Sequence, residues 1–237
     1  FRRVLFRSSG FFFLKMVNME EKVLEPSSSQ KTNKKYDWDL ITKALIPTLI
    51  IAVGAGLTIP LISLFFFKVH GLDKGEFAPV STLAAVLVAF AAVMVPRIKT
   101  GMGFKIAIPV TQSLAVISLV ALATTEFYKE LPIAVVIAIV FYLLRQPLMN
   151  VAGPMTTEVV MQYVGKRNRE MVSVLTSAIW SGSWFISLVF SSYVFKAGYS
   201  FVTLFLITSM LYALGVFWYY LLLLDFKKRK QKGLIDF

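Results

Sequence analysis

The sequence predicts an all-α membrane protein, a polytopic bundle of six transmembrane helices. Of its 237 residues, 57% are hydrophobic and only 16% are charged, whereas about a quarter of the residues in a soluble domain are charged. Uncharged segments of about 20 residues or more recur along the chain, and a helix of that length covers the bilayer core of about 30 Å. Helices satisfy their own backbone in lipid, and these segments lack the alternation of barrel strands.

The N-terminal residues are predicted to lie outside the bundle. Residues 2–8, RRVLFRS, read like a translated sequencing-adaptor oligonucleotide, so we interpret residues 1–14 as an artefact or as the end of a preceding helix. Residues 15–38 are rich in Ser, Lys, Glu and Asn, which is typical of a flexible cytoplasmic linker. The six-helix domain is expected over residues 39–226 and a basic cytoplasmic tail over residues 227–237.

Six segments are long enough to span a membrane, and the fourth alone contains a charge, Arg145. They are residues 44–67, 77–96, 106–125, 131–157, 171–195 and 197–224. We expect short connections between them, at residues 68–76, 97–105, 126–130, 158–170 and 196–200.

Lys and Arg residues near the predicted helix ends gather on one side of the membrane. They precede the first helix, follow the second and the fourth, and form a cluster after the sixth. By the positive-inside rule both termini are expected to be cytoplasmic, in what we expect to be a bacterial inner (plasma) membrane. Tyr36 and Trp38 at one end, and Trp218, Tyr219 and Tyr220 at the other, are interpreted as interfacial aromatics.

Several classes of function are disfavoured by the residues that the chain lacks. It has no cysteine and a single histidine, His70, so thiol catalysis and multi-histidine or thiolate metal sites are excluded. The predicted helices contain no pair of acids for membrane-embedded catalysis, and there is no phosphate-binding loop motif. The basic residues lie between apolar segments, which is not the pattern of a nucleic-acid-binding domain. We therefore expect that the protein is not an enzyme and that it uses no cofactor or metal. The lipid bilayer is its expected partner.

Arg145 lies about 20 Å along its predicted helix, near the middle of the bilayer. A guanidinium at that depth costs several kcal/mol unless it is paired or hydrated. It is therefore either a substrate-binding residue that faces a cavity or a structural hydrogen-bonding residue.

The other candidate substrate-binding residues are polar or aromatic side chains within the predicted helices. Gln146 and Asn150 share a helix face and, like Gln112, either bind substrate or join neighbouring helices. Trp180 and Trp184 are one turn apart and face either a cavity or lipid.

Four motifs in the chain contain glycine or proline residues. These are GAGLTIP (54–60), RIKTGMGFK (97–105), LLRQPLMNVAGP (143–154) and SAIWSGSW (177–184). With these motifs, the helix pattern and the polar linker, residues 35–224 resemble the C-terminal half of a major facilitator superfamily transporter. RIKTGMGFK is similar to the basic, glycine-rich loop of that family but lacks its initial acidic residue.

The resemblance implies an MFS-like half transporter whose substrate binds near the bilayer midplane, against an N-terminal six-helix half. Candidate gating or hinge residues are Gly54, Gly56, Pro60, Gly101, Gly103, Lys105, Pro147, Gly153 and Pro154. We expect secondary active transport of a small solute by alternating access, and Arg145 favours an anionic group on that solute. A six-helix scaffold, or a permease subunit without its own transport cycle, stays open as the alternative.

Overall fold

The computed structural model describes residues 36–231, and in them every regular element is helical, which confirms the predicted all-α class. The elements are α2 (Trp38–Thr58), the 3-10 helix η1 (Ile59–Leu61), α3 (Ile62–His70), α4 (Lys74–Thr124), the 3-10 helix η2 (Thr125–Tyr128), α5 (Pro132–Tyr163), α6 (Gly165–Lys196) and α7 (Phe201–Gln231). The predictions for residues 1–14, for the linker before residue 36 and for the tail after residue 231 lie outside the described residues.

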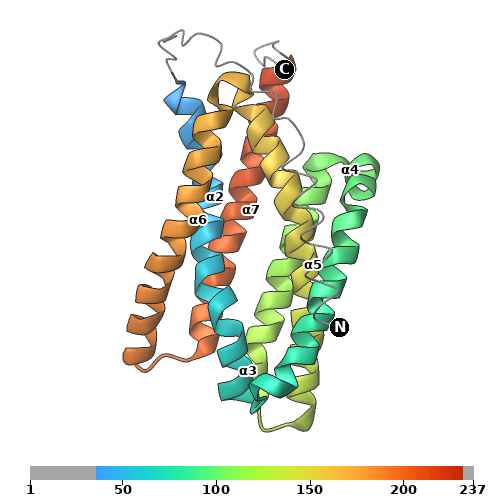
Figure 1. Ribbon diagram of the computed structural model, residues 1–237, viewed down its shortest axis with the longest axis vertical. Helices are drawn as coiled ribbons and strands as arrows, with labels where there is room; N and C mark the ends of the chain where they lie inside the picture. Colours follow the sequence, from blue (N-terminus) through green and yellow to red (C-terminus); the bar gives the residue numbers. More distant parts are fainter. Residues whose placement is uncertain (1–35, 232–237) are drawn as a thin grey trace, which may run out of the picture. The chain divides into compact units, whose positions relative to one another are not determined.

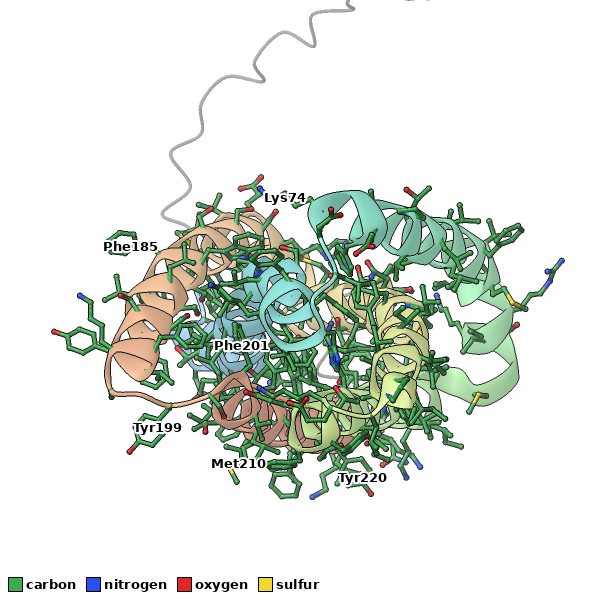
Figure 2. The ribbon with its side chains drawn as sticks, turned by 90° about the horizontal axis from the view of Figure 1, so that it is seen from below. Lys74, Phe185, Tyr199, Phe201, Met210 and Tyr220 are labelled. Atoms are coloured by element: carbon green, nitrogen blue, oxygen red, sulfur yellow. The ribbon has the colours of Figure 1, made fainter. Side chains whose placement is uncertain are left out.

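Within residues 36–231, five helical stretches are long and apolar enough to cross a membrane. They are Trp38–His70, Lys74–Tyr128, Pro132–Tyr163, Gly165–Lys196 and Phe201–Arg229. Large apolar side chains cover the outside of this unit, and Figure 2 shows Phe185 and Met210 pointing away from the helices. An apolar surface of this kind causes aggregation in water, but it is compatible with the apolar interior of a lipid bilayer. The chain is therefore an integral membrane protein.

The helices extend beyond the predicted hydrophobic segments. α5 continues to Tyr163 and α6 begins at Gly165, so the connection predicted over residues 158–170 is mostly helical. The connection predicted over residues 68–76 shortens to residues 71–73. Helical backbone hydrogen bonds do not depend on hydrophobicity, so a helix continues through charged residues until a cap or a turn ends it.

The connection predicted over residues 97–105 lies within α4, which is broken at Gly103. Gly103 has φ 67° and ψ 162°, a conformation that is essentially restricted to glycine. Figure 1 shows α4 folding back on itself at its labelled end. The two predicted segments 77–96 and 106–125 thus lie in one element, on either side of this break.

An ion pair ties the break in α4 to α5. Lys99 Nζ donates to Glu158 Oε1 at 2.6 Å, and the same ammonium lies 4.9 Å from the ring centre of Phe104. Both members of the ion pair are partly exposed, so its contribution to stability is small, about 0–1 kcal/mol.

α2 packs against α6 and α7, while α4 packs against α5 and α7 (Figure 1). Small residues allow the close approach of α2 and α6, since a Cβ on Gly56 would lie 2.6 Å from Ser187 Oγ. Ser187 Oγ in turn donates to the backbone oxygen of Val53 at 2.9 Å. On the α7 side, Gly54 lies against the Tyr212 ring. The contacts of α2 bring these helices together around one cavity.

An aromatic cluster fixes α3 against the start of α7. The ring centre of Phe65 lies 5.8 Å from that of Phe201 and 5.1 Å from that of Phe205, and Figure 2 shows Phe201 inside the helical unit. His70 ends α3, and its Nε2 shares a hydrogen bond of 3.0 Å with Thr125 Oγ1.

Candidate solute-binding cavity

A cavity of about 470 Å³ lies between α2, α4, α5, α6 and α7. Its volume is in the range of small-molecule sites in proteins, about 300–1,000 Å³. Of the predicted substrate-binding residues, it brings together Arg145, Gln146, Asn150, Gln112 and Trp180. The rest of its lining comprises Thr48, Ile51, Ala55, Ile59, Val88, Ala92, Met149, Gly153, Pro154, Thr156, Thr157, Tyr212 and Tyr219.

Among the described residues of this lining Arg145 alone is charged, and it is 1% exposed. Its Nη2 donates to the Tyr212 hydroxyl at 3.3 Å, and its guanidinium carbon lies 5.8 Å from the centre of the Tyr212 ring. Its Nε has no hydrogen-bond partner within the described residues. The ring face and the hydroxyl of Tyr212 both stabilise the cation, but neither neutralises it.

Carboxylates on the nearby helices α5 and α7 interact with residues other than Arg145. Glu158, on the same helix as Arg145, pairs with Lys99. Asp225 accepts hydrogen bonds from the Tyr163 hydroxyl at 2.7 Å and from Arg229 Nε at 3.0 Å. Among the ion pairs of residues 36–231, none involves Arg145, so its charge faces the cavity uncompensated.

Amide side chains add hydrogen-bonding groups to the wall. Gln112, in the part of α4 that follows the break at Gly103, is 4% exposed, and its Oε1 has no donor in the part of the chain that the structure describes. Asn150 Nδ2 donates to the backbone oxygen of Gln146 at 2.8 Å, within α5. This bond leaves Asn150 attached to its own helix rather than to a neighbour.

The two tryptophans of α6 differ in position although they are similarly exposed. Trp180 is 37% exposed and lines the cavity, whereas Trp184 is 39% exposed and lies outside its lining. Trp180 is therefore a cavity residue, whereas Trp184, one helical turn away and equally accessible, is not.

Two tyrosines of α7 also line the cavity, although neither is among the predicted substrate-binding residues. Tyr212 accepts from Arg145, and Tyr219 shares a hydrogen bond of 3.1 Å with Thr48. Tyr219, interpreted from the sequence as an interfacial aromatic, has a buried side chain. The spacing of seven residues, two helical turns, is the signal that places both tyrosines on one face of α7.

The predicted gating or hinge residues do not lie together in the structure. Gly153 and Pro154 line the cavity, and Gly54 and Gly56 lie in tight contacts of α2. The others lie elsewhere: Pro60 in η1, Pro147 within α5, and Gly101, Gly103 and Lys105 at the break of α4.

Comparison of the chain with protein-family models, with curated proteins and with solved structures finds no match. A cavity whose neutral wall mixes apolar and polar side chains around one uncompensated cation is suited to hold a small anionic molecule.

Proposed function

We propose that the chain is a six-helix half of a secondary transporter of the major facilitator kind, which moves a small solute across a bacterial inner membrane. The observation that supports this best is the cavity around Arg145. A buried charge within the apolar part of a membrane protein is costly and typically marks a substrate path. Here five helices contribute polar groups to the same space as that charge.

The six-helix count rests on the two arms of α4, which we propose cross the bilayer separately. The break at Gly103 divides the element, and its second arm, residues 104–124, has the roughly 20 residues that one crossing needs. With two crossings in α4, residues 36–231 cross the membrane six times. The break then lies on the same side of the membrane as the basic residues of α7, among them Lys227 and Lys228, and the positive-inside rule makes that side cytoplasmic.

In this proposal the partner is a second six-helix half, packed over the open side of the cavity, and in proteoliposomes a second copy of this chain takes that place. Trp180, Asn150 and Gly153 are exposed along that side. Rocking of the two halves exposes the solute first to one side of the membrane and then to the other, without nucleotide hydrolysis. Arg145 holds the negative charge of the solute during the exchange.

The test is solute counterflow into proteoliposomes that contain the full chain, with a panel of radiolabelled small organic acids. We expect counterflow of at least one acid, reduced about tenfold by Trp180→Ala, since loss of roughly 1.4 kcal/mol of contact gives that factor. Trp184→Ala is the matched control and stays within about twofold. Absence of counterflow for the whole panel contradicts transport, and equal losses in the two variants contradict the position of the site.

A further inference from the structure

The cavity presents a single positive charge that no acid balances. All of its described lining residues other than Arg145 are neutral at pH 7. The acceptor that Arg145 has, the Tyr212 hydroxyl, is also neutral, and Arg145 Nε has none. The wall therefore matches one negative charge on the solute. A carboxylate is the most suitable group, because the planar guanidinium donates to both carboxylate oxygens at once.

Gln112 adds a second requirement, for a hydrogen-bond donor on the solute. Its Oε1 is buried and accepts no hydrogen bond from residues 36–231, and leaving such an acceptor unsatisfied costs free energy. An ammonium group on the solute is a poor donor for this place, because the lining residues that the structure describes include no carboxylate to balance its charge. A hydroxyl group donates to Gln112 without bringing a charge.

We propose that the cavity binds a hydroxylated organic monocarboxylate, with its carboxylate at Arg145 and a hydroxyl at Gln112. On binding, the carboxylate takes over from the Tyr212 hydroxyl as the acceptor for the guanidinium. This ligand class gives the substrate of the proposed transport function, and its biological meaning rests on that function.

The test compares four solutes with six-carbon chains that differ in their charged groups and in whether they carry hydroxyls. Gluconate has the carboxylate and the hydroxyls, hexanoate lacks the hydroxyls, glucitol lacks the charge, and 6-aminohexanoate replaces the hydroxyls by one ammonium. Binding of radiolabelled gluconate to the purified full chain is measured by equilibrium dialysis, and the other three are added as competitors. We expect each competitor to bind about tenfold or more weakly than gluconate. Equal or tighter binding of any of the three overturns the proposal, as does absence of gluconate binding.

The role of Gln112 has its own test. Gln112→Leu removes the acceptor at similar volume, so gluconate affinity falls about tenfold while hexanoate affinity stays within about twofold. An equal loss for both acids indicates a purely structural role and overturns the assignment of Gln112. Should this variant fail to fold, the comparison of the four solutes on the unaltered chain still decides the ligand class.

Counterflow in proteoliposomes separates this proposal from the proposed function. Tight gluconate binding without counterflow contradicts transport but supports the ligand class. Counterflow of all four solutes at similar rates supports transport but contradicts the ligand class.

Discussion

At the scale of residues, Arg145 can be predicted from the sequence as a cavity residue, whereas Tyr212 cannot. Arg145 is predictable because it is the only charge within six long apolar segments. Its partner Tyr212 is 67 residues further along the chain. The seven-residue spacing puts Tyr212 and Tyr219 on one face of α7, but the sequence does not show whether that face or the one with the exposed Tyr220 is buried, because burial depends on how α7 is rotated against α2 and α4.

Removing the Tyr212 hydroxyl is expected to destabilise the protein. Tyr212→Phe leaves Arg145 without its only hydrogen-bond acceptor among the described residues. Losing a buried hydrogen bond to a charged group costs about 1.5–3 kcal/mol. Thermal unfolding of the purified protein in detergent should therefore shift to lower temperature.

Tyr220→Phe is the control, since Tyr220 lies on the same helix and faces outward (Figure 2). We expect it to leave the unfolding temperature unchanged. Equal behaviour of the two variants is incompatible with a stabilising Arg145–Tyr212 hydrogen bond.

At the scale of elements, the positions of the apolar helices are predictable but their ends and contacts are not. Counting apolar residues identified segments 77–96 and 106–125, because the bilayer imposes a minimum length. The same count predicts a loop for the polar stretch between these two segments. In the structure that stretch is helical up to the break at Gly103. Likewise, glycines 54 and 56 were singled out as flexible positions, and the structure places both in tight helix contacts.

The contact between α2 and α6 predicts a sharp difference between two glycines. In Gly56→Ala the new Cβ would lie 2.6 Å from Oγ and 2.8 Å from Cβ of Ser187, so the two helices must separate. We expect a loss of about 1–3 kcal/mol in the free energy of unfolding.

Gly182→Ala, on α6, provides the comparison. A Cβ at Gly182 meets no atom within 4 Å, and alanine favours helix over glycine by about 1 kcal/mol. Chemical denaturation in mild detergent should show this variant to be as stable as the parent protein or more so. A Gly56→Ala protein of parental stability argues against the close α2–α6 contact.

The break in α4 gives the second prediction at this scale. Gly103→Ala forces a side chain into a backbone region that is almost exclusive to glycine, at a cost of about 1–3 kcal/mol. Gly101→Ala lies two residues away, where a Cβ meets open space and φ is not positive. Circular dichroism melts should therefore rank Gly103→Ala below Gly101→Ala, and the reverse order is inconsistent with a turn at Gly103.

At the scale of the whole molecule, the membrane character was predictable from composition, and the way in which distant helices form the cavity was not. Apolar content and segment length are local properties of the chain. The cavity depends on long-range packing, with α2 against α6 and α7 and α4 against α5 and α7. This is why five of the six candidate substrate-binding residues share one space while Trp184, chosen by the same reasoning, does not.

The proposed six crossings can be tested by labelling single cysteines, because the sequence contains no cysteine of its own. If both arms of α4 cross, Gly101→Cys and Lys228→Cys react with a membrane-impermeant maleimide from the same side, and Lys129→Cys reacts from the other. All three positions are exposed. Labelling of residues 101 and 129 from one side contradicts two separate crossings in α4.

The packing of α2 also determines the order in which the protein completes its fold during synthesis. α4 and α5 are neighbours along the chain and pack on each other, so they can associate soon after they leave the ribosome. α2 leaves the ribosome before them, yet its main contacts are with α6 and α7, the last helices to be made. Until α6 and α7 are made, Thr48 lacks its hydrogen-bond partner Tyr219. Gly54 and Gly56 lack the helices that pack against them. The first of the described helices to be translated is thus among the last to reach its native contacts.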